Sequence, residues 1–179
     1  FLKKIIKKIL LKNNWKLENI IIPKKYNQES PKKELVEAMI NSSGILHIGA
    51  HRGSEAPVYE WFGKKVVWIE ANPNIYENLR ENLIKYKLQT SFCRLITDKD
   101  DQEYSFKISN NDGASSSIYN FSNINSEEMF LDRNFSMKEE IKIKSISLDN
   151  FFKKEKIDPK NFNHWVIDVQ GSELDLFKG

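Results

Sequence analysis

The residue types that could do chemistry gather in two short segments, His47–Gly53 and Asp168–Glu173. Each segment follows a run of apolar residues that predicts a short buried strand. In open sheets of parallel strands, ligands bind outside the carboxyl ends of the strands, so both segments are candidates for one binding site. Within the first segment, Gly49 and Gly53 allow a tight backbone turn and a close approach of a ligand to the main chain.

An acidic residue supports this interpretation. Glu70 ends the next predicted strand, Val66–Ile69, and follows Gly49 by 21 positions. At about this spacing a carboxylate is placed to accept hydrogen bonds from the hydroxyl groups of a ribose. The turn and the acid together indicate a ligand that contains adenosine. The alternative is a plain turn between a strand and a helix, with Glu70 in solvent.

The phosphate-binding motifs of nucleotide-binding proteins are absent from the sequence. A dinucleotide site requires G-x-G-x-x-G and a P-loop requires G-x-x-x-x-G-K-[ST], and neither pattern occurs. Without a cradle for a pyrophosphate, NAD and ATP are less favoured than S-adenosylmethionine, which carries adenine and ribose but no phosphate. An enzyme that uses another adenosine ligand is the least favoured alternative.

Asp168 and Glu173 place two carboxylates near the same end of the predicted sheet. A carboxylate there can act as general base for a hydroxyl group or hold a substrate. Taken alone, the two acids are better explained by the start of a helix, where negative charge is favoured. The functional interpretation is preferred only if several strand ends build one site.

Metal and hydrolase chemistry have little support. His47 and His51 are four residues apart, but the turn between them spoils the helical spacing of a metal site, and His164 is distant in sequence. The single cysteine, Cys93, excludes a cysteine-based zinc site and an internal disulfide, and is compatible with the cytoplasm. Gly-x-Ser-x-Gly is absent. We therefore predict no metal.

The elements that must position these residues alternate between helix and strand. Short apolar runs predict strands, listed here: Ile45–Ile48, Val66–Ile69, Phe92–Ile96 and Trp165–Ile167. Helical spacing and turn residues predict helices between the first three of these strands. This order predicts parallel strands joined by right-handed crossovers, a Rossmann-like α/β sandwich. Two-faced patterns predict an edge hairpin inserted in it, from Tyr104–Ile108 and Ile141–Ile146.

Composition and charge limit the other function classes. The 179 residues, 40% of them hydrophobic, suit one domain with a core. The net charge is +3, and only four of the 28 basic residues are arginine, the residue that best reads bases and clamps phosphates. A dedicated nucleic-acid binder is therefore not expected.

The N-terminal residues form a separate pattern. Within residues 1–11, apolar residues recur at helical spacing with lysines between them. We favour a helix that packs on the domain, and the alternative is a basic helix that contacts a membrane surface weakly. We divide the chain into a helical extension, residues 1–43, and an α/β domain, residues 44–179.

Several segments, in the same order along the chain, resemble the motifs of the FkbM-type methyltransferases. They are Ile45–Gly53, Trp68–Pro73, Ser115–Ser117, Ser147–Asp149 and Ile167–Leu174. The resemblance extends from Ile45 to Gly179. It implies a class I, Rossmann-like fold that binds S-adenosylmethionine and usually methylates a hydroxyl oxygen.

The resemblance also implies roles for individual residues. Gly49 and Gly53 would line the methionine part of the cofactor, and Glu70 its ribose. Asp168 would lie near the methyl group and the acceptor, where it is the preferred base, with His51 second. The remaining expected cofactor contacts are Ala50, His51, Glu55, Ala71, Thr97 and Asp98; the last two would lie near the adenine.

The sequence departs from the family pattern in places. Many members carry aspartate and asparagine at the positions of His47 and His51, and a lysine at the position of Val166. The complete family sheet has more strands than the four parallel ones that we can place, so we expect an N-terminal part of an enzyme.

The predicted function is S-adenosylmethionine-dependent O-methylation of a sugar or small metabolite, with a small-molecule or glycan acceptor as partner. The alternative is a non-catalytic α/β binding module that retains the fold. The sequence specifies neither the acceptor nor the oligomeric state.

Overall fold

The computed structural model describes residues 33–119 and 136–179. The chain divides into two units, residues 1–37 and 38–179, and all the strands given below lie in the second. Helix α2 (Lys33–Asn41) crosses the boundary between the units. The helix predicted within residues 1–11 lies outside the described residues.

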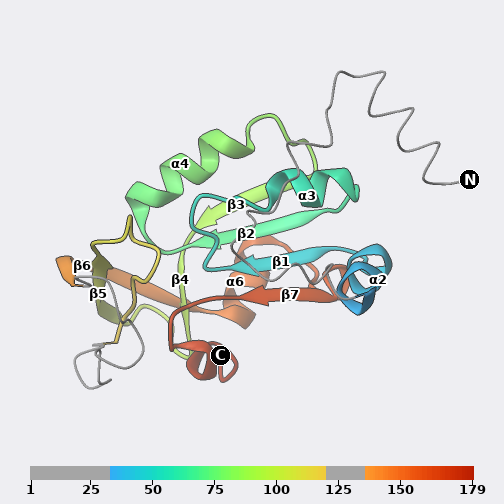
Figure 1. Cartoon of the computed structure of the whole chain (residues 1–179). Helices are drawn as coiled ribbons and strands as arrows, with labels where there is room; N and C mark the ends of the chain where they lie inside the picture. Colours follow the sequence, from blue (N-terminus) through green and yellow to red (C-terminus); the bar gives the residue numbers. More distant parts are fainter. Residues whose placement is uncertain (1–32, 120–135) are drawn as a thin grey trace, which may run out of the picture. The chain divides into compact units, whose positions relative to one another are not determined.

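A parallel sheet forms the centre of the second unit (Figure 1). Its described strands follow the order β3 (Gln89–Cys93), β2 (Val66–Glu70), β1 (Ile45–Ile48) and β7 (His164–Ile167). Helix α3 (Ala56–Trp61) connects β1 to β2, and α4 (Pro73–Leu83) connects β2 to β3. The predicted α/β fold with a mostly parallel sheet is confirmed.

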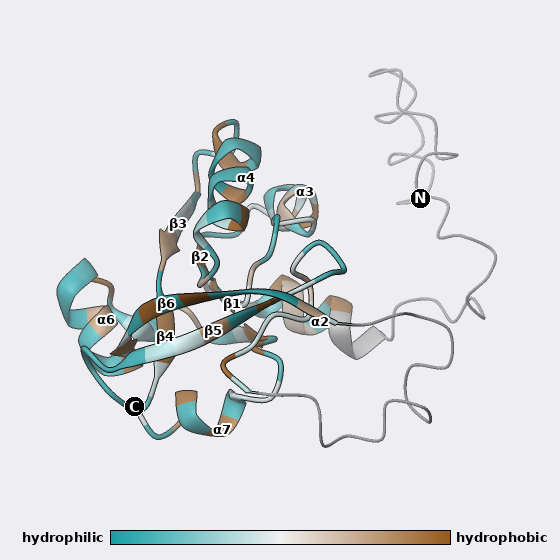
Figure 2. Cartoon of the chain, turned by 90° about the vertical axis from the view of Figure 1, so that its left-hand side faces the viewer, coloured by the Kyte–Doolittle hydropathy of each residue, from teal (hydrophilic) through white to brown (hydrophobic). Residues whose placement is uncertain are grey.

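Alternating side chains give this sheet two buried faces. Ile45 and Trp68 pack on one face with residues of α3 and α4, such as Leu79. Leu46 and Val67 point to the opposite face, which forms a second hydrophobic cluster. In Figure 2, α4 carries both hydrophobic and hydrophilic residues, as expected of a helix that covers a sheet.

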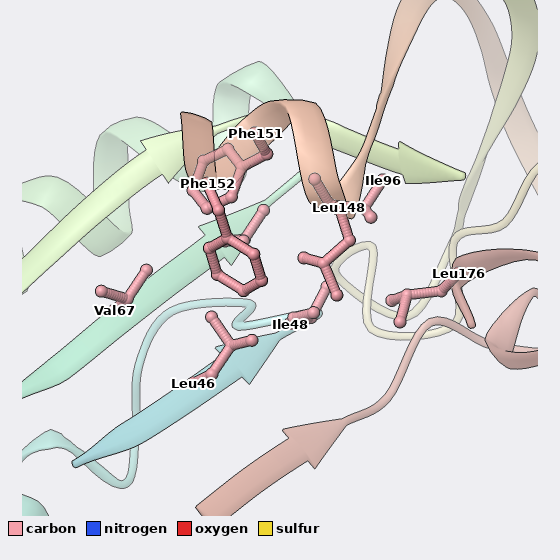
Figure 3. Packing of buried hydrophobic residues seen from close by; sticks show 9 residues of the cluster. Leu46, Ile48, Val67, Ile96, Leu148, Phe151, Phe152 and Leu176 are labelled. Atoms are coloured by element: carbon pink, nitrogen blue, oxygen red, sulfur yellow. The ribbon is translucent and has the colours of Figure 1, made fainter. Parts of the chain in front are cut away.

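The second cluster is closed by α6 (Leu148–Glu155). Figure 3 shows its residues Leu148, Phe151 and Phe152 over the side chains of the sheet. Ile96 and Leu176, the latter from the short helix α7 (Glu173–Leu176), extend the cluster toward the carboxyl ends of the strands. Helices therefore cover both faces, so that binding groups are left at the strand ends.

A second sheet corrects one prediction. The single strand predicted over Phe92–Ile96 is two strands, because the chain leaves the parallel sheet after Cys93. Beyond Arg94, whose main-chain N–H donates to the carbonyl of Glu70 (3.0 Å), β4 (Leu95–Thr97) pairs with β6 (Met137–Ser147).

The predicted hairpin is confirmed within this second sheet. β5 (Glu103–Ser109) pairs antiparallel with β6, and the order is β4, β6, β5. The hairpin is therefore joined to β4 and not to an edge of the parallel sheet.

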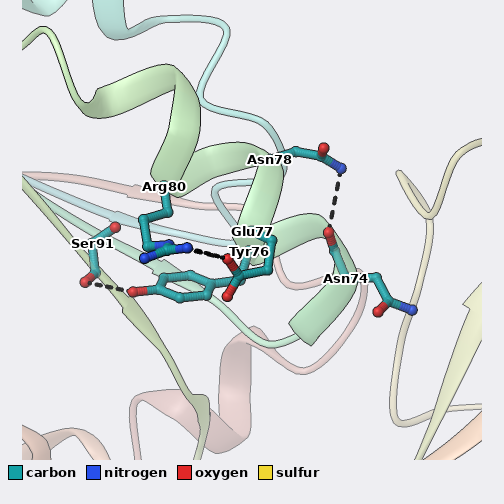
Figure 4. Close-up of polar contacts among 6 residues, drawn as sticks. All are labelled: Asn74, Tyr76, Glu77, Asn78, Arg80 and Ser91. Carbon is teal, nitrogen blue, oxygen red and sulfur yellow. Dashed lines mark hydrogen bonds and ion pairs between the residues drawn. The ribbon is translucent and has the colours of Figure 1, made fainter.

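The start of α4 is capped by its own sequence. The Asn72 side-chain oxygen accepts hydrogen bonds from the main-chain N–H groups of Asn74 (3.0 Å) and Ile75 (3.5 Å). Pro73 occupies the first helical position, where no N–H is needed. On the outer face, Arg80 pairs with Glu77, and the carbonyl of Asn74 accepts from Asn78 (Figure 4).

His47 is a buried titratable group beneath α3. Its ring is stacked on Trp68 with centroids 4.7 Å apart, and its Nδ1 lies 3.2 Å from the Tyr59 hydroxyl. Only 6% of His47 is exposed. Burial lowers its pKa from 6.5 to about 4, so the ring is neutral in the folded protein at neutral pH.

Acid should therefore destabilise the protein through this ring. The unfolded chain takes up the proton as pH falls below about 6.5, whereas the folded protein does so only near pH 4. We expect a loss of about 3 kcal/mol in the free energy of unfolding across this interval. Urea unfolding at several pH values measures it. His47→Asn should flatten the dependence, and His164→Asn should retain most of it, because burial lowers the pKa of His47 more than the charge of His164 does. Equal slopes for wild type and His47→Asn would contradict the assignment.

Candidate functional site

A cavity of about 180 Å³ lies at the carboxyl ends of β1, β2 and β7. The sequence-predicted residues that line it are Gly49, His51, Glu70, Ala71 and Asp168. Its volume is below the roughly 300 Å³ at the lower end of ligand pockets, so a larger ligand would extend beyond the enclosed part.

Main-chain contacts join the three strand ends that build the cavity. The N–H of Gly49 donates to the carbonyl of Ile69 (2.9 Å), and the N–H of Asp168 donates to the carbonyl of Ile48 (2.9 Å). Gly49 has a φ of +82°, and a Cβ built on it would lie 1.9 Å from the carbonyl oxygen of Asp168. Only glycine fits here, because both the backbone conformation and the space exclude a side chain.

Glu70 lies in the wall of the cavity and is only 8% exposed. One carboxylate oxygen accepts from the N–H of His51 (2.7 Å), and the other accepts from the N–H of Asn72 (2.8 Å). Burial raises the pKa of Glu70, although these two hydrogen bonds act in the opposite direction. The alternative of a solvent-exposed Glu70 is therefore wrong.

The two acids after β7 differ in their contacts. Glu173 accepts hydrogen bonds from the main-chain N–H groups of Val169 (3.3 Å) and Gly171 (3.2 Å), so its carboxylate binds the turn before α7. Asp168 is exposed and accepts from the Gln170 side chain through Oδ1 (2.5 Å). Its Oδ2 makes no hydrogen bond to any residue in the described part of the chain. Of the two, only Asp168 lines the cavity.

The loop after β5, residues 110–119, forms part of the cavity wall, and we call it the covering loop. It is held from two sides. On one side, the His51 Nε2 donates to the carbonyl of Asp112 (3.0 Å). On the other, the Ser117 hydroxyl donates to the carbonyl of Gln170 (2.8 Å), and the Tyr119 hydroxyl bonds to Asp175. The carbonyl of Asp112 can only accept, so His51 carries its proton on Nε2 in this arrangement.

The serines of this loop stabilise the loop itself. The hydroxyl of Ser115 accepts from the Asn111 side chain (2.9 Å), and that of Ser116 donates to the carbonyl of Gly113 (2.7 Å). The hydroxyls of the Ser115–Ser117 motif are thus engaged in the fold.

The other sequence-predicted site residues do not line the cavity. Ala50 is buried with the core, and Gly53 lies against Leu79. Glu55 is exposed and accepts from the Ser54 hydroxyl. Thr97 is fully buried with its hydroxyl bonded to the main chain of Lys99, and the half-buried Asp98 follows it.

An apolar wall of the cavity was not predicted from the sequence. Its residues come from β4, β5 and the covering loop, and are Leu95, Ile96, Phe106 and Ile118. The alternation within Tyr104–Ile108 indicates that Phe106 faces inward, but not that it faces this cavity. The wall depends on how the second sheet meets the first.

Two kinds of feature are absent from residues 33–119 and 136–179. This part of the chain contains no group of three histidine, cysteine or acidic side chains placed to hold a metal ion. It also contains no helix of the length and apolar character needed to cross a membrane.

Comparison with protein-family models matches the chain to the methyltransferase FkbM domain over residues 47–179. Because the match covers most of the chain, the chain belongs to the FkbM methyltransferase family, and the resemblance of its motifs is confirmed. Comparisons with curated proteins and with solved structures give no significant match.

Gly49 allows a matched test of the contact between strand ends. Gly49→Ala should destabilise the protein by about 3 kcal/mol or more, because the backbone strain is joined by a clash with the main chain of Asp168. Gly63→Ala is the control: its φ is +63° but no atom lies within 4 Å of the added Cβ, so strain alone should cost about 1 kcal/mol. Urea unfolding compares the two, and equal losses would show that the strand ends can separate freely.

Proposed function

We propose that this domain binds S-adenosylmethionine in the cavity and transfers its methyl group to a hydroxyl oxygen of a sugar or small metabolite. Membership of the FkbM family supports methyl transfer. The observation that carries the cofactor proposal is the buried carboxylate of Glu70 in the cavity wall. A carboxylate whose burial opposes its charge is typical of binding sites, where a ligand can supply the missing donors.

The residues present fit the parts of this cofactor. Glu70 has lone pairs beyond those used by His51 and Asn72, and would accept hydrogen bonds from the ribose hydroxyls. Gly49 lines the cavity and would contact the methionine part through its main chain, since the carbonyl of Asp168 fills the space of its missing side chain. Ala71 and the apolar wall that includes Phe106 would hold the adenine. Thr97 and Asp98, which the family pattern suggested for the adenine, do not line the cavity.

The chemistry requires orientation and removal of one proton. When bound, S-adenosylmethionine supplies a methyl carbon that forms a bond to the acceptor oxygen as its bond to sulfur breaks. Asp168 Oδ2 would take the proton of the acceptor hydroxyl, and the walls of the cavity would hold the acceptor in line. Asp168 is preferred to His51 as the base, because the bond from the His51 Nε2 to the carbonyl of Asp112 holds that ring against the covering loop and leaves only Nδ1 to accept a proton.

One observation favours a second candidate, a binding module that retains the fold without catalysis. Val166 stands where many family members carry a lysine, and its side chain packs beside the cluster under α3 and α4. An apolar side chain such as that of Val166 can supply neither the charge nor the hydrogen bonds of that lysine. A methyltransferase would turn over an acceptor, and a binding module would not. Cofactor binding is required of the methyltransferase, whereas a binding module could lack it.

Calorimetric titration with S-adenosylhomocysteine tests the cofactor proposal. Wild type should bind, and Glu70→Gln should weaken binding by about tenfold or more, because a charged acceptor of ribose hydroxyls is lost. Asp168→Asn should bind within about twofold of wild type and lose turnover with any acceptor that is found. Glu81→Gln, on the exposed side of α4, is the matched control. Wild-type affinity in a folded Glu70→Gln protein would contradict the ribose assignment.

A further inference from the structure

A second cavity, of about 190 Å³, lies between the start of α4 and the β5–β6 hairpin. We call it the polar groove; its polar lining includes Arg52, Asn72, Asn74, Asp112, Lys138 and Glu139. Gly113 lines both cavities, so the turn at Asp112 and Gly113 is a wall shared by the groove and the candidate cofactor site.

A buried amide donor opens onto the polar groove. Asn72 is only 2% exposed, and its oxygen caps α4. Its Nδ2 makes no hydrogen bond to the residues that the structure describes, and a Cβ built on Gly113 would lie 3.5 Å from it. Within the described residues, Ser105 Oγ is the one fully enclosed side-chain N or O atom without a partner, so the Asn72 nitrogen is not fully enclosed, and its N–H group can bind a ligand that enters the groove.

The side chains around Asn72 are balanced in charge. Arg52 lies 3.5 Å from Asp112, and both side chains are well exposed. Lys138 and Glu139 come from the exposed part of β6. An anionic ligand would be repelled by two carboxylates, those of Asp112 and Glu139. A cationic ligand would be repelled by two cationic side chains, those of Arg52 and Lys138. A neutral ligand rich in hydroxyl groups, which both donate and accept, can satisfy all of these groups together.

The remaining lining suits the same class of ligand. Ile75 and Ile108 supply apolar surface, against which the C–H groups of a sugar ring can pack. Figure 4 shows the side-chain amide of Asn74 directed away from Asn78. That amide adds one more donor and one more acceptor at the groove.

We propose that the polar groove binds a sugar or a comparable polyol as part of the methyl acceptor. The role as acceptor site rests on the proposed function, since it assumes that the neighbouring cavity holds the methyl donor. Binding of the sugar itself does not depend on the donor.

Nuclear magnetic resonance of the full chain labelled with ¹⁵N tests this directly. Neutral methyl glycosides of several hexoses and deoxyhexoses are titrated at millimolar concentrations without any cofactor, with inorganic phosphate as a separate probe. At least one glycoside should shift the side-chain amide resonance of Asn72. Asn72→Asp keeps the helix cap but removes the donor, and should weaken binding by about tenfold. Asn72→Ser should do the same without an added charge.

Asn78→Asp is the control on the same helix, and it should bind the glycoside like wild type. The proposal is overturned if no glycoside shifts Asn72, if Asn72→Ser binds as tightly as wild type, or if phosphate alone shifts this resonance. A parallel titration with S-adenosylhomocysteine separates the two proposals. Glycoside binding without binding of S-adenosylhomocysteine would contradict only the proposed function. Binding of S-adenosylhomocysteine without glycoside binding would contradict only the proposal for the polar groove.

Discussion

The site depends on one buried interaction, the pair of hydrogen bonds that the Glu70 carboxylate accepts from the main chain. One of these bonds holds the turn after β1 at His51, and the other holds the start of α4 at Asn72. Burying the charge is unfavourable, and the two N–H groups offset part of that cost. Together with Gly49, whose missing side chain lets β1 and β7 meet, this carboxylate determines the shape of the cavity.

The same arrangement links the candidate cofactor cavity to the groove beside it. His51 binds Glu70 through its main chain and the covering loop through its ring. Asn72 donates its main-chain N–H to Glu70, caps α4 through its side-chain oxygen, and turns its amide nitrogen to the polar groove. The same short turns therefore line both the candidate cofactor cavity and the polar groove.

Local patterns along the sequence were sufficient for the central sheet. The apolar runs at Ile45–Ile48 and Val66–Ile69 and the Asn72-Pro73 helix start identified the strands and crossover that the structure contains. The run Phe92–Ile96 was misleading, because an apolar run does not show where the backbone leaves one sheet for another. That break at Arg94 depends on pairing with β6, which lies far along the chain.

The site was predictable to a similar degree. Gly49, Glu70 and Asp168 come together because each ends a parallel strand, a rule that can be applied to a sequence. Thr97 also ends a strand, but its side chain bonds to Lys99 in the interior, and spacing alone does not show this. Phe106 and the covering loop were missed since they reach the cavity only through contacts between distant segments.

A crystal structure of the chain with S-adenosylhomocysteine tests whether the methyl donor binds with its ribose against Glu70. We expect the ribose hydroxyls within hydrogen-bonding distance of the Glu70 carboxylate and the sulfur atom on the side of Asp168. A ligand bound outside this cavity, or one whose ribose contacts other residues, would contradict it.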